Sequence, residues 1–119
     1  LVAVHRLDRQ TSGVALFARG PEVARWVGAC LSERRVEKRY RAWVHPPPVE
    51  ERFEVTGWML REPHPSRFRF GLRDAPLAGA RESRSRFRCI AEHAGRVLLE
   101  AEPVTGRAQQ QRVHLGGRG

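Results

Sequence analysis

Two alternating segments late in the chain limit its fold more than any other feature. Within residues 82–92 and 96–102, apolar side chains occupy every second position from 87 to 91 and from 97 to 101, and Ala94-Gly95 lies between the two segments. This pattern predicts an antiparallel hairpin closed by a short turn. One face of the hairpin is expected to be apolar and to contain Phe87, Cys89, Ala91, Val97, Leu99 and Ala101. The chain must therefore build at least part of an antiparallel sheet.

The rest of the chain adds short strands and few helices. Strands are predicted at residues 13–19, 36–45, 52–60 and 67–70, with a proline-containing loop at 62–66. Helices are predicted from Pro21 to about Arg35 and over 107–115. Because helices and strands do not alternate regularly, we expect an α+β fold: a mainly antiparallel mixed sheet with flanking helices. The length of 119 residues predicts one domain over 1–119.

Two aromatic patterns are ambiguous. Trp26 lies on the apolar face of the first predicted helix, which favours a place in the core over a base-stacking role. The segment RFRF at 67–70 alternates cations and rings, which could stack on nucleic acid. It is more typical of an amphipathic hairpin strand with its rings turned inward.

The charge of the chain indicates a polyanionic partner. The sequence has 22 Lys and Arg against 13 Asp and Glu, a net charge of +9, and Lys38 is its only lysine. Arginine suits phosphate contacts and stacking on bases, although an arginine-rich solvated surface is the alternative. Cys30 and Cys89 have no CxxC partner, which indicates free thiols and no metal site. No apolar run is long enough to span a membrane.

Residues 5–13 (HRLDRQTSG) carry the first candidate site. Asp8 lies between Arg6 and Arg9, and the small residues after it predict a turn before an apolar run. The flanking cations favour an ionised carboxylate, which can act as a nucleophile or a base. Taken alone, this loop is more typical of a solvated surface aspartate without a catalytic role.

Two later stretches change that interpretation. With residues 5–13, the segments KRYRAWV at 38–44 and PVTGRAQQQRVHL at 103–115 resemble the three ordered motifs of the RluA-type pseudouridine synthases. The resemblance implies isomerisation of uridine to pseudouridine in rRNA or tRNA without a metal or organic cofactor. We expect the enzyme to be a cytoplasmic monomer. It also implies a pseudouridine synthase-like catalytic core. Since the first motif is near one end and the third near the other, we expect a fragment truncated at both ends.

The resemblance also assigns roles to residues. It makes Asp8 the catalytic carboxylate, Arg112 its cationic partner and Tyr40 the ring against the uracil. Arg6 matches the residue that fills the gap left by a flipped base. Arg107, just past Gly106, is a candidate phosphate ligand, and Thr11 is expected to set the turn of the first loop.

The third motif departs from the family pattern. Ala108, Gln109 and Gln111 stand where Thr or Ser, His and an aliphatic residue are usual. Gln109 cannot titrate near neutral pH as His can, and a buried Gln111 without partners would cost about 1–3 kcal/mol. With the expected truncation, these departures make a non-catalytic RNA-binding remnant the alternative to an enzyme. A third interpretation is an unrelated basic DNA-binding domain, but the sequence has no recognisable helix-turn-helix or zinc pattern.

Overall fold

A computed structural model describes residues 1–65, 67–107 and 109–117, apart from the side chains of 64, 67–69 and 117. The chain divides into two compact units, Leu1–Glu37 and Lys38–Gly119. Each unit has its own secondary structure and is described by itself. The expectation of one catalytic domain over residues 1–119 stays a prediction.

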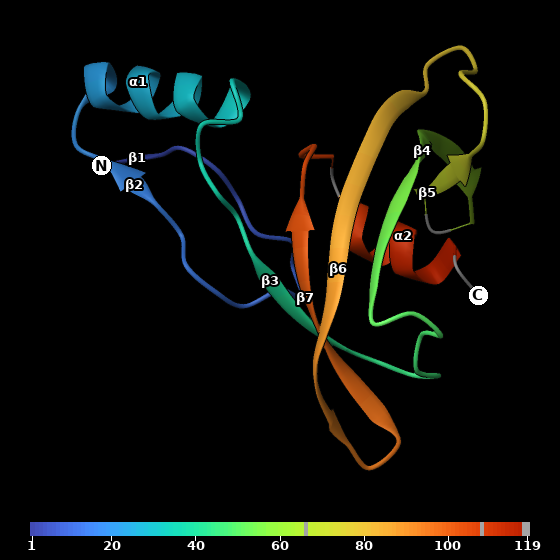
Figure 1. Cartoon of the computed structure of the whole chain (residues 1–119). Helices are drawn as coiled ribbons and strands as arrows, with labels where there is room; N and C mark the ends of the chain where they lie inside the picture. Colours follow the sequence, from blue (N-terminus) through green and yellow to red (C-terminus); the bar gives the residue numbers. More distant parts are fainter. Residues whose placement is uncertain (66, 108, 118–119) are drawn as a thin grey trace. The chain divides into compact units, whose positions relative to one another are not determined.

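The first unit is a small α/β element. Strands β1 (Val2–Ala3) and β2 (Phe17–Ala18) pair antiparallel, and helix α1 (Pro21–Ser32) follows (Figure 1). Pro21 occupies the first turn of α1, where its missing N–H has no partner to lose. The strand predicted at 13–19 is much shorter, because only its last residues join the ladder.

The prediction that Trp26 lies in a core is wrong. Its side chain is 64% exposed, and among the described residues of α1 only Cys30 is buried. The physical reason is the size of the packing partner, since α1 contacts β1 and β2, which are two residues long each. A helical apolar stripe shows which face is able to pack, and does not show how much of it is covered.

The second unit is a five-stranded antiparallel sheet with one helix. Its order is β3-β7-β6-β4-β5, and α2 (Gln110–Gly117) follows β7 (Figure 1). The strands are β3 (Tyr40–Val44), β4 (Arg52–His64), β5 (Arg67–Arg73), β6 (Arg81–His93) and β7 (Arg96–Pro103). The α+β class and the antiparallel pairing are confirmed.

The predicted hairpin is β6–β7, with Ala94-Gly95 at its turn. Both turn residues have positive φ, 51° and 76°, as tight hairpin turns require. One detail of the prediction is wrong: a bulge between Cys89 and Ala91 makes Ala91 pair with Leu98. The extra residue reverses the faces, so Ala91 leaves the face that holds Phe87 and Cys89.

Strand β4 is longer than expected. It continues through Glu62, Pro63 and His64, where a loop was predicted. Pro63 is tolerated because the ladder with β6 ends at Met59, so this part of β4 pairs only with β5. Strand β5 confirms the strand predicted at 67–70. The Phe68 ring was expected to point inward, but this side chain lies outside the described residues, so that expectation stays a prediction.

The core of the second unit lies on one face of the sheet. It contains Phe53, Val55, Phe87, Val97, Leu99 and Ala101, with Tyr40 and Leu115 among the residues packed against it. The Phe53 and Phe87 rings stack with centroids 5.0 Å apart. Helix α2 contributes Leu115, so it lies on this inner face. In the described part of the chain, no helix is long and apolar enough to cross a membrane.

Candidate active site

The first motif forms the loop between β1 and β2. The N–H of Thr11 donates to the carbonyl of Asp8 at 2.9 Å, which closes a turn. The N–H of Leu16 donates to Nε2 of His5 at 2.8 Å and ties the two arms of the loop together. Asp8 and Thr11 are half-buried, and Arg6 is exposed. The sequence prediction of a loop that presents Asp8 agrees with this geometry.

Tyr40 begins β3 on the inner face of the sheet. It pairs with Ala101 of β7 and packs against the core. Tyr40, Ala42 and Val44 are half-buried while Arg41 and Trp43 are exposed, as the predicted alternation requires. Tyr40 therefore has a rigid backbone and a partly accessible side chain.

The third motif is fixed to the sheet through Gln110, which is 1% exposed. Its Nε2 donates to the Arg84 carbonyl at 2.8 Å and to Ser85 Oγ at 2.7 Å. Its Oε1 accepts from Thr105 Oγ1 at 2.5 Å and from the Arg107 N–H at 3.1 Å. One buried amide thus joins the Thr105–Arg107 loop, the start of α2 and strand β6.

His114 continues this network one helical turn later. Its Nε2 lies 2.8 Å from Ser83 Oγ and its Nδ1 lies 3.0 Å from Ser85 Oγ. Because Ser83 Oγ donates its proton to the Gly57 carbonyl at 2.9 Å, it must accept from His114 Nε2–H. Ser85 Oγ accepts from Gln110 Nε2–H, and it donates its own proton to Nδ1 when the histidine is neutral. Burial lowers the pKa of His114 to about 4, which agrees with this assignment.

The two arginines of the third motif have different surroundings. The Nε–H of Arg107 donates to the Glu82 carbonyl at 2.9 Å, and its side chain is half-buried. Arg112 lies on α2, two residues after the buried Gln110 and two before the buried His114, and its residue is exposed. Gly106 lies in the exposed loop before them.

The departures from the family pattern have different structural outcomes. Gln109 is exposed at the start of α2, with a positive φ of 56°. Gln111 is only half-buried, so the cost expected for a buried amide there does not apply in full. Ala108 lies outside the described residues.

The sequence analysis missed the buried polar residues. They are Ser83, Ser85, Thr105, Gln110 and His114, all less than 7% exposed. A signal was present: Gln110 and His114 are four residues apart on a helix, and Ser83 and Ser85 alternate in phase with Phe87. The partners could not be paired without knowing that α2 packs on β6.

The predicted site residues fall in both units. Asp8, Arg6 and Thr11 belong to the first unit, whereas Tyr40, Gly106, Arg107 and Arg112 belong to the second. Within the second unit, Tyr40 and α2 lie on the same face of the sheet. The pairing of Asp8 with Arg112 stays a prediction.

Comparison with known proteins decides the family. A family model described as RNA pseudouridylate synthase matches residues 1–116, which include all three motifs. The chain belongs to this family. Ribosomal large subunit pseudouridine synthase C of Vibrio cholerae is 36% identical over 114 residues, and the match covers 96% of this chain and 34% of that protein. An uncharacterized RNA pseudouridine synthase of Zymomonas mobilis is 32% identical over 111 residues, and the match covers 93% of this chain and 49% of that protein.

Solved structures of pseudouridylate synthases share the fold. Human RNA Pseudouridylate Synthase Domain Containing 1 has a TM-score of 0.85 at 25% identity, and the match covers 99% of this chain and 51% of that one. Human RNA Pseudouridylate Synthase Domain Containing 4 has a TM-score of 0.82 at 22% identity, and the match covers 98% of this chain and 47% of that one. The chain thus spans about a third to a half of its pseudouridine synthase relatives.

Proposed function

We propose that this chain forms the catalytic core of an enzyme that isomerises uridine to pseudouridine in RNA. The family match over residues 1–116 is the observation that carries the proposal. The reaction breaks the N1–C1′ bond, turns the uracil and forms a C5–C1′ bond; C5 loses a proton and N1 gains one. The atoms balance within the substrate, so no oxidant, reductant or group donor is consumed, and we propose that the reaction uses neither a metal nor an organic cofactor.

Three residues are assigned to the chemistry. The Asp8 carboxylate acts at the ribose, either by attack or by promoting elimination. Arg112 pairs with it, because a carboxylate that must stay charged in a dry pocket needs a cation with fixed direction. Tyr40 lies against the uracil, where a phenol offers both a stacking face and a proton donor or acceptor. The half-buried positions of Asp8 and Tyr40 support these roles.

Other residues are assigned to RNA binding. The target base must leave its helix to be reached and turned, and the exposed Arg6 would fill the gap. Arg107 and Gly106 would meet a phosphate beside α2. Thr11 keeps the Asp8 turn closed through its backbone N–H. The expected substrate is rRNA or tRNA, and the enzyme is proposed to act as a monomer in the cytoplasm.

The test is tritium release from RNA labelled at C5 of uridine, using the intact protein. Tritium leaves C5 only when the C5–C1′ bond replaces it, so release above a no-enzyme control supports the proposal. A protein that binds RNA without releasing tritium from rRNA or tRNA would instead be the non-catalytic RNA-binding remnant.

A further inference from the structure

The outer face of the sheet, opposite Tyr40 and α2, carries a cluster of charged residues. We call it the arginine face; its members are Arg41, Arg52, Arg84, Arg86, Arg88, Glu54, Glu100 and Glu102. Strand register aligns them in rows. One row crosses four strands and the next crosses three; the rows are Arg41-Glu100-Arg88-Arg52 and Glu102-Arg86-Glu54. All five arginines are exposed.

The ion pairs on this face hold arginines in place and leave donors unused. Glu54 accepts from Arg84 Nε at 2.6 Å and from Arg86 Nε at 3.4 Å. Glu100 accepts from one Nη of Arg88 at 3.2 Å. A guanidinium has five N–H donors, and each of these contacts uses one. The side chains of Arg84, Arg86 and Arg88 are 45–55% exposed. Beyond the contacts described, each guanidinium therefore has further N–H donors that solvent can reach.

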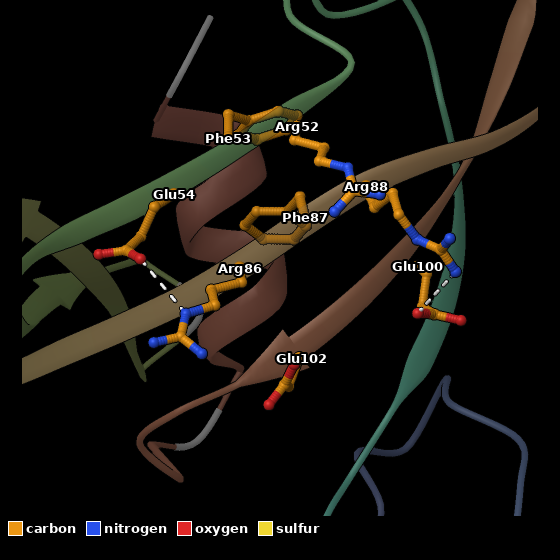
Figure 2. A pocket seen from close by; sticks show the side chains of 8 residues that line it. All are labelled: Arg52, Phe53, Glu54, Arg86, Phe87, Arg88, Glu100 and Glu102. Carbon is orange, nitrogen blue, oxygen red and sulfur yellow. Dashed lines mark hydrogen bonds and ion pairs between the residues drawn. The ribbon is translucent and has the colours of Figure 1, made fainter.

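A groove runs along the same face. Its volume is about 400 Å³ (Figure 2). The charged residues that line it are Arg52, Arg86, Arg88, Glu54, Glu100 and Glu102. Figure 2 shows Arg86 and Arg88 extending in different directions from β6, each toward its own glutamate. Alternate residues of a strand are about 6.7 Å apart, so these two side chains can meet two different phosphates.

An exposed tryptophan extends the face toward the β6–β7 turn. Trp43 is 52% exposed and lies on the same side of β3 as Arg41, two residues away. A second hollow of about 390 Å³ adjoins Trp43, His45 and Arg96. Guanidinium groups beside an accessible aromatic ring are typical of proteins that bind single-stranded nucleic acid, since phosphates bind the cations and bases stack on the ring.

We propose that the arginine face and Trp43 form a second RNA-binding surface, which holds single-stranded RNA that flanks the target uridine. This inference rests on the proposed function. Five arginines against three glutamates give the face an excess of positive charge, which suits a phosphate backbone. Glu54 competes with phosphate for Arg84 and Arg86, so its removal is predicted to strengthen RNA binding.

The test measures the Kd of the intact protein for a single-stranded RNA that contains the substrate uridine, over a range of salt. The double variant Arg86→Gln/Arg88→Gln should raise Kd about ten-fold. It should also lower the slope of log K against log salt by about 1.4, because two phosphate contacts are lost. The matched control is Arg19→Gln/Arg25→Gln, which removes the same charge from exposed positions of the first unit. This control should change Kd and slope much less.

Two further variants separate RNA contact from a general charge effect. Trp43→Leu should raise Kd without changing the salt slope, because stacking releases no counterions. Glu54→Gln should lower Kd. In turnover assays the arginine variants should raise KM with kcat unchanged, since this surface touches no reacting atom.

Equal effects of the two double variants on the RNA Kd would overturn the inference. An unchanged or higher Kd in Glu54→Gln would overturn it as well. If Arg86→Gln/Arg88→Gln does not fold, the other two variants decide: the inference requires a lower Kd in Glu54→Gln and a higher Kd in Trp43→Leu. If the wild-type protein releases tritium and all of these variants bind RNA with the wild-type Kd, the second RNA-binding surface is wrong and the proposed function stands. Wild-type protein that releases no tritium would count against the proposed function instead.

Discussion

At the scale of single residues, two arginines of one motif are given different tasks. Arg107 already donates to a backbone carbonyl of β6, which restrains its guanidinium. Arg112 is exposed and lies between the two anchoring residues Gln110 and His114 on α2, so its backbone is held firmly. A restrained helix position suits a residue that must face one carboxylate with a fixed direction.

The conservative substitution Arg112→Lys should lower kcat by at least ten-fold. Lysine keeps the charge but loses the planar fork that would orient Asp8. Arg107→Lys should mainly raise KM, because a phosphate accepts a point charge well. Single-turnover rates and RNA affinities of both variants check this contrast. Loss of kcat in Arg107→Lys, with Arg112→Lys near wild type, would reverse the two assignments.

The candidate residues could be chosen from the sequence because they lie inside contiguous motifs. Asp8, Tyr40 and Arg112 were chosen because these motifs resemble those of a known family. Ser85 and Gln110 could not be paired that way, since they are 25 residues apart and meet only through the packing of α2 on β6. The alternation of Ser83 and Ser85 with Phe87 indicates the inner face of β6, but it does not show that a helix will meet their hydroxyl groups.

At the scale of elements, β4 has little room at Gly57. A Cβ there would lie 2.6 Å from Leu72 Cδ1 and 3.2 Å from the Arg73 carbonyl. Gly57→Ala should therefore lower the free energy of unfolding by about 1–3 kcal/mol, as overpacking usually does. Denaturant unfolding measures it. In the control Gly71→Ala, the crowded atoms belong to the ends of the Glu62 and Arg73 side chains, which can turn away, so the loss should be smaller. Equal losses would contradict this account of the crowding.

The anchoring of α2 predicts a pH dependence of stability. Burial lowers the pKa of His114 from 6.5 to about 4, so the unfolded chain binds its proton first as the pH falls. Stability from this group is complete above pH 6.5 and is lost between pH 6.5 and about 4, at up to roughly 1.4 kcal/mol per pH unit. His114→Gln should remove that part of the slope in unfolding measured at several pH values. An unchanged slope would contradict a buried neutral histidine.

How well elements could be predicted depends on how local their determinants are. The β6–β7 hairpin follows from alternation and two turn residues, and both are adjacent in the sequence. The bulge after Cys89 was not predictable, because it reflects how β6 fits its neighbour β7. Trp26 was misplaced for a similar reason: its exposure depends on how much structure packs against α1.

At the scale of the whole molecule, the net charge of +9 should dominate RNA affinity. Contacts between arginines and phosphates release counterions, so log K should fall linearly as log salt rises. Filter binding or anisotropy between about 50 and 200 mM salt measures the slope. A flat dependence would mean that the arginines form only a solvated surface.

The central claim is that Asp8 performs the isomerisation, and Asp8→Asn tests it most directly. The amide removes the negative charge at nearly unchanged volume, so folding and RNA binding should be preserved. The decisive measurement is single-turnover tritium release by this variant beside its RNA Kd. The account predicts no detectable release with a Kd within a few-fold of wild type. Release within a few-fold of the wild-type rate would show that Asp8 is not the catalytic group.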